Sequence, residues 1–238
     1  MTLSIFFPAY NEEANIEAAV RKALEVARDL KEVEKFEIIV VDDGSSDRTG
    51  EITDRLALEI PQVRAIHHHP NRGYGGALRS GFKNSRFEWV VFTDSDGQFD
   101  FSEIKKFLPL TSRADLILGY RLKRADSILR RLFTWGWKIL VRLLLGLDVR
   151  DYSCGFKLIR RDVAKAVEPI EAEEKVYQIE FLVKAQKQGF RFAEVGVHHY
   201  PRAAGSQTGA NFKVVMKSLR DLFSLWYRLR VPVKKASP

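Results

Sequence analysis

Cysteine is nearly absent from this chain of 238 residues. Cys154 stands alone, so no disulfide can form within the chain, which is compatible with a reducing compartment. The sequence also lacks the charge-free run of about 20 apolar residues that a membrane-spanning helix requires. Its first residues lack the basic segment and long apolar stretch of a signal peptide, and we find no internal repeat. These absences argue against a secreted disulfide scaffold, an integral membrane protein and a repeat array.

Acidic residues are outnumbered by basic ones, 31 to 39, which gives a formal net charge of +8. Such a balance indicates an anionic partner: nucleic acid, nucleotide phosphate or acidic lipid. Charge alone does not choose among the three. A hydrophobic content of 45% and a charged content of 29% are typical of an ordinary globular protein, and the length allows one or two domains.

Apolar segments alternate with helical patterns along the first half of the chain. We expect strands at residues 3–7, 36–41, 63–66, 89–93 and 116–118, the first of them stopped by Pro8. Helices are expected at 49–59, 77–82 and 102–108, and Asn11 is expected to cap another that precedes the second strand. This alternation predicts right-handed βαβ crossovers and therefore an α/β fold with a mostly parallel central sheet flanked by helices.

Carboxylates follow two of these strands directly. Asp94 and Asp96 end the strand at 89–93, and Asp42 is the first acid after the strand at 36–41. The carboxyl edge of a parallel sheet is where α/β proteins bind ligands. Two carboxylates with the amide oxygen of Gln98 suit Mg²⁺ or Mn²⁺, which would also hold phosphate oxygens. The alternative is that both segments are ordinary acidic turns, with Ser46 or Asp47 capping the next helix.

Two other motifs carry less chemistry. The glycine-rich segment 71–76 lacks the Lys-Ser/Thr of a P-loop and the spacing of a dinucleotide fingerprint, so we interpret it as a turn between strand and helix. His67, His68 and His69 could suggest a metal cluster. Consecutive residues of a strand point to opposite faces, which disfavours that interpretation.

Two segments of the second half, 128–147 and 211–229, combine a wide apolar face with a basic stripe. At about 100° per residue, Arg131, Lys138 and Arg142 share one narrow stripe of the first segment. This pattern is typical of a helix that lies in a membrane interface, and its alternative is a core helix with a solvated face. The residues predicted to face the membrane are Lys138, Arg142, Trp135 and Trp137.

Motifs in a fixed order carry a family resemblance. They are Phe-Pro-Ala-Tyr-Asn-Glu at 7–12, Val-Asp-Asp-Gly-Ser-Ser-Asp-Arg-Thr at 41–49, Asn-x-Gly-x-Gly-x-Ala-Leu at 71–78, Asp-Ser-Asp-Gly-Gln at 94–98, Gly-Tyr-Arg at 119–121, Asp-Tyr-Ser-Cys-Gly-Phe-Lys at 151–157 and Pro-Arg-x-x-Gly at 201–205. The set resembles family-2 glycosyltransferases, most closely their polyprenyl-phosphate branch, of which dolichyl-phosphate mannose synthase is the typical member. It covers nearly the whole chain to about residue 213.

The resemblance implies a GT-A nucleotide-diphospho-sugar transferase fold and an activity that requires Mg²⁺ or Mn²⁺. It also implies roles for individual residues: Pro8, Tyr10, Glu12, Asp42 and Asp94 bind the nucleotide, Asp94, Asp96 and Gln98 bind the metal, Arg121, Arg130, Arg131 and Ser153 contact the acceptor or phosphate, and Asp94, Asp96, Arg121 and Arg202 form the catalytic set. Arg202 would belong to a loop that closes over the donor. After Gly205 the sequence has Ser-Gln-Thr where the family often has a lysine, so Arg130 or Arg131 would help to neutralise the leaving pyrophosphate.

The nature of the acceptor follows from a missing base. Transfer to a sugar hydroxyl needs a general base, and relatives with such acceptors usually carry a Glu-Asp pair and a Gln-x-x-Arg-Trp motif, neither of which occurs here. Glu180 stands roughly where that acid would be. A phosphate monoester, with a second pKa of about 6, is already largely ionised at pH 7. We therefore predict inverting transfer of a hexose, mannose or glucose, to a dolichyl or undecaprenyl phosphate.

The prediction places a single domain at 1–230, with a nucleotide-binding half (1–122), an acceptor and membrane-facing half (123–230) and a flexible tail (231–238). The expected location is the cytoplasmic face of a membrane, as a peripheral protein. Two alternatives remain open: the same fold with a saccharide or soluble acceptor, and a catalytically silent nucleotide-binding module. Nucleic acid is not an expected partner, because the basic residues lie beside apolar faces without alternating aromatic residues. The sequence leaves the sugar, the nucleoside and the oligomeric state open.

Overall fold

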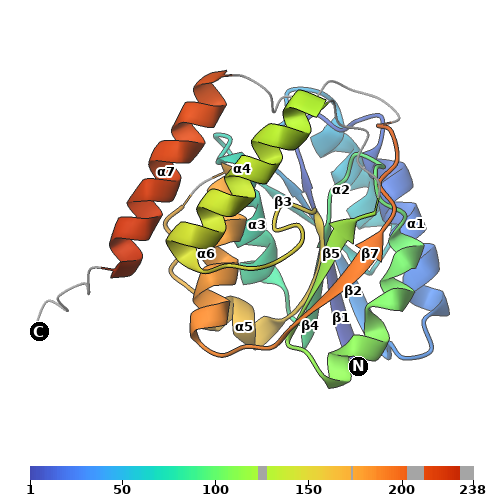
Figure 1. Cartoon of the computed structure of the whole chain (residues 1–238). Helices are drawn as coiled ribbons and strands as arrows, with labels where there is room; N and C mark the ends of the chain where they lie inside the picture. Colours follow the sequence, from blue (N-terminus) through green and yellow to red (C-terminus); the bar gives the residue numbers. More distant parts are fainter. Residues whose placement is uncertain (123–127, 173, 203–211, 231–238) are drawn as a thin grey trace, which may run out of the picture.

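A computed structural model describes residues 1–122, 128–172, 174–202 and 212–230, and at 128–134, 174–175 and 212–216 it describes the backbone alone. Within these ranges the chain forms a seven-stranded sheet with helices on both faces (Figure 1). The strand order is β3-β2-β1-β4-β6-β5-β7. The strands are β1 (Thr2–Ala9), β2 (Lys35–Asp42), β3 (Val63–His67), β4 (Trp89–Thr93), β5 (Leu116–Arg121), β6 (Phe156–Arg160) and β7 (Phe192–Val197). β6 runs antiparallel to β4 and β5, and the other described pairs are parallel. The predicted mostly parallel sheet is confirmed.

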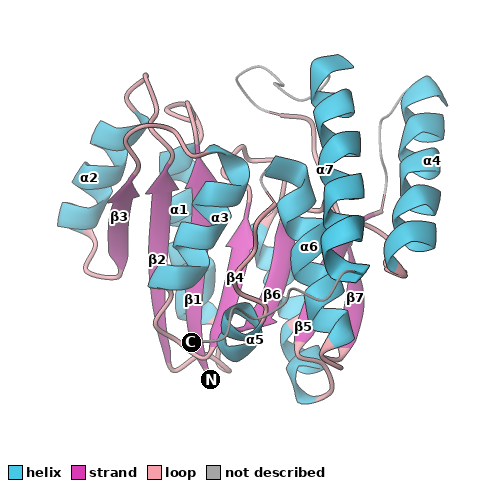
Figure 2. Cartoon of the chain, turned by 90° about the vertical axis from the view of Figure 1, so that its left-hand side faces the viewer, coloured by secondary structure: helices cyan, strands magenta, loops and turns pink. Residues whose placement is uncertain are grey.

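Side chains of the sheet alternate between two cores, as the period of two residues in a strand dictates. Leu3, Ile5 and Phe7 face a core shared with α1 (Ile16–Asp29), α2 (Thr49–Glu59) and the 3₁₀ helix η1 (Phe101–Lys106). Phe6 and Phe92 face the opposite core, which α3 (Gly73–Asn84), α5 (Arg161–Ala166) and α6 (Glu174–Lys187) cover (Figure 2). Because both faces are covered, the central strands are near-continuous apolar runs rather than alternating ones.

Two expectations at the end of the first strand are wrong. β1 continues through Pro8 to Ala9. Pro8 has no N–H to donate, but β4 pairs with β1 only as far as Phe6, so the pairing of these two strands does not need that hydrogen bond. Asn11 does not cap a helix. Its φ of 55° places it in the left-handed region that asparagine tolerates, and its Oδ1 accepts a hydrogen bond from the Ser46 amide, while α1 begins only at Ile16.

Elsewhere the boundaries shift rather than the elements. α3 begins at Gly73, inside the segment expected to be a turn, and the helix expected at 102–108 is a pair of 3₁₀ helices, η1 and η2 (Leu108–Ser112). The two amphipathic segments form α4 (Ile128–Leu145) and α7 (Phe212–Arg230). α7 contacts both α6 and α4 on the outer side of the second core (Figure 2). Within the part of the chain that is described, no helix combines the length and the apolar character needed to cross a bilayer.

Candidate active site

The acidic strand ends meet at one edge of the sheet. The register of β1 sets Ala9 level with Asp42 on β2 and Phe6 level with Phe92 on β4. Asp94, two residues beyond Phe92, is therefore level with Pro8. Since β1, β2 and β4 are parallel, both acids lie at the carboxyl edge of the sheet. The single strand β1 separates β2 from β4, so these two strands are roughly 10 Å apart. This geometry allows one ligand to reach both.

Asp94 occupies a partly buried position between charged groups. The Tyr74 hydroxyl donates to its Oδ1 at 3.0 Å. Burial first, and then the neighbouring charge of Asp96, raise the pKa of Asp94 to about 6, although Tyr74, Lys157 and Arg121 act in the opposite direction. Gly155 lies directly against this carboxylate, and a methyl group at that position would overlap it. The glycine of the Ser-Cys-Gly-Phe segment is therefore required by the space that Asp94 occupies.

Asp96 and Gln98 connect this site to the chain that precedes Arg202. The Gln98 amide N–H donates to Asp96 Oδ1 at 3.1 Å, and Arg202 Nη1 lies 3.9 Å from Asp96 Oδ2. The Gln98 side chain donates to the carbonyl of Tyr200 at 3.0 Å, while the Tyr200 amide donates to the Gln98 carbonyl at 2.8 Å. The side-chain amide of Gln98 is therefore directed to the segment 200–202.

The donor set at this edge fits a hard divalent cation. Two carboxylates, Asp94 and Asp96, repel one another in a partly desolvated corner, and a cation would remove that repulsion. No group of three or more histidine, cysteine, aspartate or glutamate side chains is arranged to hold a metal among the described residues. The remaining ligands would then come from a bound diphosphate and water, which is the usual arrangement for Mg²⁺ held by one or two carboxylates.

The end of β1 supplies the second wall of the site. Tyr10 is half exposed, whereas Glu12 is buried and held by three neighbours. Its amide donates to Thr49 Oγ1 at 2.8 Å, its Oε2 accepts from Asn15 Nδ2 at 2.8 Å, and its Oε1 pairs with Arg202 Nη2. Arg202 thus joins the predicted nucleotide-binding and metal-binding residues. Arg202 was expected to belong to a loop that closes over the donor, and the residues that follow it, 203–211, lie outside the described residues.

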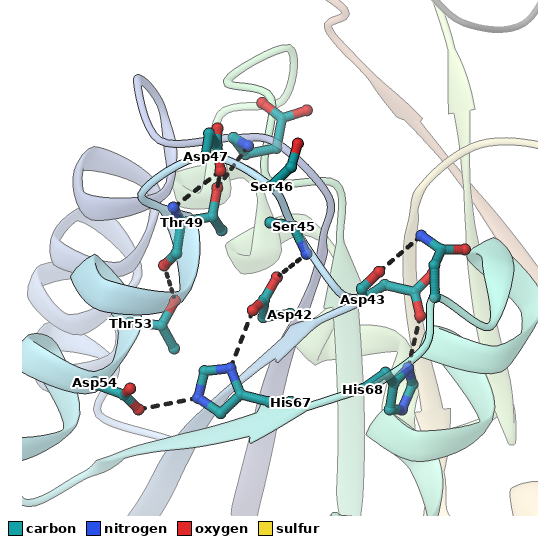
Figure 3. A network of polar contacts seen from close by, with 12 residues as sticks. Asp42, Asp43, Ser45, Ser46, Asp47, Thr49, Thr53, Asp54, His67 and His68 are labelled. Atoms are coloured by element: carbon teal, nitrogen blue, oxygen red, sulfur yellow. Dashed lines mark hydrogen bonds and ion pairs between the residues drawn. The ribbon is translucent and has the colours of Figure 1, made fainter.

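The turn after β2 is tightly organised (Figure 3). Asp42 Oδ1 accepts from the Ser45 amide at 3.1 Å, and Asp43 Oδ1 accepts from the Arg72 amide at 2.8 Å. His67 contacts Asp42 and His68 contacts Asp43, at 3.0 Å and 2.6 Å. The expectation that neighbouring histidines point to opposite faces is confirmed.

Arg121 stands at the same edge, at the end of β5. It forms a two-pronged ion pair with Asp151: Nε donates to Oδ2 at 2.7 Å and Nη2 to Oδ1 at 3.0 Å. Nη2 also donates to Ser153 Oγ at 2.9 Å, so these predicted phosphate contacts are adjacent. Burial lowers the pKa of Arg121, but the Asp151 carboxylate outweighs it and the pKa is raised. The side chains of Arg130 and Arg131 lie outside the described parts of α4.

Lys157 belongs to the motif at 151–157, but the sequence predicted no role for it. It is almost fully buried in β6 and donates to the carbonyl of Cys154 and to Gln178 Oε1. Gln178 Nε2 in turn reaches the Tyr74 hydroxyl at 3.3 Å, which continues to Asp94. Burial lowers the pKa of Lys157 to about 8. A lysine inside an apolar strand was the signal that could have marked Lys157 as a site residue, although it does not reveal the partners.

Glu180 and Cys154 are both buried away from solvent. Glu180 on α6 is 1% exposed and accepts hydrogen bonds from the backbone amides of Glu171 and Ala172. It also pairs with Lys184 and with Arg228 of α7. Cys154 is fully buried, and burial raises the pKa of its thiol to about 12, which suits packing rather than nucleophilic attack.

The residues predicted to face a membrane are divided by the structure. Trp135 is 65% exposed and Arg142 is also at the surface, where it pairs with Asp148. Trp137 is half-buried against the second core, and Lys138 donates to the carbonyl of Arg150. The outward side of the helix pair is defined here by its exposed apolar residues, Trp135, Ile139 and Leu143 on α4 and Phe223 and Tyr227 on α7.

Sequence comparison identifies the family. Residues 4–168 match the model of the family described as glycosyl transferase family 2, which is more than half of the chain. The chain belongs to glycosyltransferase family 2, as its motifs predicted.

Relatives named as transferases of polyprenyl phosphates support the polyprenyl-phosphate branch. The chain is 30% identical to a dolichyl-phosphate beta-glucosyltransferase of Dictyostelium discoideum over 98% of this chain and 76% of that protein. It is 27% identical to an undecaprenyl-phosphate mannosyltransferase of Micrococcus luteus, over 86% of each. It is 35% identical to glycosyltransferase AglD of Haloferax volcanii, over 84% of this chain, but it spans only 33% of the length of that protein.

Solved structures confirm the predicted GT-A fold. Glucosyl-3-phosphoglycerate synthase of Mycobacterium tuberculosis, in complex with phosphoglyceric acid, superposes with a TM-score of 0.69 at 21% identity, covering 95% of this chain and 80% of that one. The same protein in complex with Mn²⁺, UDP-glucose and phosphoglyceric acid gives a TM-score of 0.68 at 20% identity, with the same coverage.

Proposed function

We propose that this protein is an inverting, metal-dependent glycosyltransferase that moves a hexose from a nucleotide-diphosphate sugar to a polyprenyl phosphate. The observation that carries the proposal is the meeting of Asp42, Asp94, Asp96 and Arg121 at one sheet edge. The relatives named as dolichyl-phosphate and undecaprenyl-phosphate transferases support it. The structural neighbour crystallised with Mn²⁺ and UDP-glucose supports a divalent cation, either Mg²⁺ or Mn²⁺.

Each group has a part in the proposed transfer. Asp42 and the end of β1 hold the nucleoside, and Asp94 and Asp96 would hold the cation, which would supply positive charge for the departing diphosphate. Arg121 and Ser153 hold the acceptor phosphate. A phosphate oxygen forms a bond to the anomeric carbon from the side opposite the diphosphate, the bond from that carbon to the diphosphate oxygen breaks, and the configuration inverts. Positioning supplies much of the rate, because the acceptor is already ionised.

The acceptor can be tested directly. We expect product from undecaprenyl phosphate and none from undecaprenol, supplied with UDP-glucose and GDP-mannose in parallel. An alcohol would need a general base, which contributes about 10²–10⁴-fold, and the acid expected at that position, Glu180, is buried and paired. Thin-layer separation of radiolabelled lipid product measures the preference. Comparable transfer to the alcohol, or to 3-phosphoglycerate as a soluble acceptor, would favour the alternative in which the same fold uses a hydroxyl of another acceptor.

We further propose that the outer surface of α4 and α7 rests on the cytoplasmic face of a membrane. Exposed Trp135, Leu143 and Tyr227 supply apolar contacts, and Lys217 and Arg220 are exposed on α7. Such a helix surface binds by apolar burial together with attraction to anionic lipids. It would bring Arg121 within reach of a lipid-linked phosphate.

Leu143→Glu is expected to reduce co-flotation with vesicles of phosphatidylglycerol and phosphatidylcholine by about tenfold or more, because burying one leucine contributes about 1.5–3 kcal/mol. Leu58→Glu is the matched control, since Leu58 is also an exposed leucine but lies on α2, on the far flank of the sheet (Figure 2). Equal flotation of both variants would exclude Leu143 from the contact.

A further inference from the structure

His67 lies between two carboxylates at the end of β3 (Figure 3). Its Nδ1 is 3.0 Å from Asp42 Oδ2 on β2, and its Nε2 is 2.9 Å from Asp54 Oδ1 on α2. Its side chain is 40% exposed, so protons can exchange with solvent. The proposed function gives Asp42 the nucleoside but assigns nothing to the histidine beneath it.

These contacts require a ring with two N–H groups. A carboxylate can only accept a hydrogen bond, and a neutral imidazole carries one N–H, so one of the two contacts would set a ring lone pair against a carboxylate oxygen. An imidazolium donates to both. Burial lowers the pKa of His67, but hydrogen bonds to Asp42 and Asp54 outweigh it and the pKa is raised. The charged groups that face the ring are Asp42 and Asp54.

The neighbouring histidine makes an informative contrast. His68 Nδ1 is 2.6 Å from Asp43 Oδ1, but its Nε2 is 2.7 Å from the Ser80 hydroxyl. A hydroxyl can donate as well as accept, so a ring with a single N–H satisfies both contacts of His68. Of these two histidines, His67 is the one whose contacts depend on a second proton.

We propose that protonated His67 is a positioning residue for the nucleotide: it holds Asp42 ready to accept a hydrogen bond from the base. The inference rests on the proposed function, which makes Asp42 the nucleoside acceptor. Asp42 is fixed from two sides, by the Ser45 amide at Oδ1 and by His67 at Oδ2. When the second proton leaves, Asp54 and Asp42 compete for the remaining N–H. Asp42 loses an anchor, and the anionic nucleotide loses a nearby positive charge.

Nucleotide affinity is therefore expected to fall as pH rises through the raised pKa of His67. We would measure dissociation constants of UDP and GDP with Mg²⁺ by calorimetry between pH 6.5 and 9.0. For whichever nucleotide binds, the wild-type affinity should fall about tenfold, the loss expected for one charge-assisted hydrogen bond. His67→Gln, which has no imidazolium charge to lose, should bind weakly and should lack this tenfold fall over the same range.

Asp54→Asn separates this role from a general effect on folding. Asp54 is 63% exposed, so its replacement should leave the fold intact. Removing this carboxylate lowers the pKa of His67, so the affinity profile should move to lower pH while the affinity at the acidic end is retained. Long-range ¹H–¹⁵N spectra of the histidine rings provide a readout independent of nucleotide: both nitrogens of His67 should be protonated at pH 6.5 and should titrate at lower pH in Asp54→Asn.

The outcomes are distinguishable. A wild-type profile that parallels that of His67→Gln, or ring spectra that show one protonated nitrogen at pH 6.5, would overturn the inference and leave the proposed function intact. Binding of neither nucleotide at any pH would overturn the proposed function, and the inference with it.

Discussion

Asp96→Asn is expected to lower kcat/KM for sugar transfer by about 10³-fold, because a cation that stabilises the departing diphosphate contributes several kcal/mol and each 1.4 kcal/mol is a factor of ten. The substitution keeps the size of the side chain and removes its charge. In the protein without a cation the two carboxylates raise each other's energy, and the charge of Asp96 helps to raise the pKa of Asp94. Thermal stability without metal should therefore be unchanged or slightly higher, while Mn²⁺ affinity falls.

Transfer assays measure kcat/KM, and a titration with Mn²⁺, monitored by electron paramagnetic resonance, measures the metal affinity. Asp100→Asn is the matched control in the same loop. Its carboxylate accepts from the Ser102 amide at 2.9 Å as the cap of η1, and asparagine caps about as well as aspartate. This control should retain both activity and metal affinity. Full activity in Asp96→Asn would remove Asp96 from the proposed metal site.

The sequence predicted the five strands β1 to β5, the central three of which are buried, but it did not predict β6 or β7. An apolar run such as 89–93, bounded by charge and turn residues, has few alternatives, and the structure places β4 at Trp89–Thr93. The meeting of the acids at one edge followed from the parallel order alone. Local rules failed where tertiary contacts decide. Asn11 has the chemistry of a cap, but its side chain is used by the Ser46 amide of another turn.

Side-chain direction on the amphipathic helices was not accessible from periodicity. Arg228 of α7 pairs with the buried Glu180, and on α4 Trp137 packs inward while Leu143 is exposed. A helical wheel gives the relative angles of side chains but not which neighbours the helix meets. The contacts of His67 and Lys157 were equally hidden, since their partners come from other strands and helices.

Glu180→Gln is expected to destabilise the fold by about 3 kcal/mol without removing the chemistry, since breaking a buried ion pair costs about 3–5 kcal/mol. The lower end applies because Lys184 and Arg228 are 22% and 31% exposed and can regain water. The melting temperature should fall by about 6–12 °C, at roughly 2–4 °C per kcal/mol for a chain of this size. Differential scanning calorimetry measures this shift.

Glu171→Gln is the matched control, because Glu171 pairs with the same Arg228 at 3.3 Å but is 58% exposed. An exposed pair contributes at most about 1 kcal/mol, so the control should melt close to the wild type. Transfer assayed well below the melting transition should persist in both variants. Glu180 has a structural role, because it joins α6 and α7 to the segment 171–172, and an ionised acceptor phosphate needs no base. An unchanged melting temperature with lost transfer in Glu180→Gln would instead make this glutamate the general base, and the acceptor a hydroxyl.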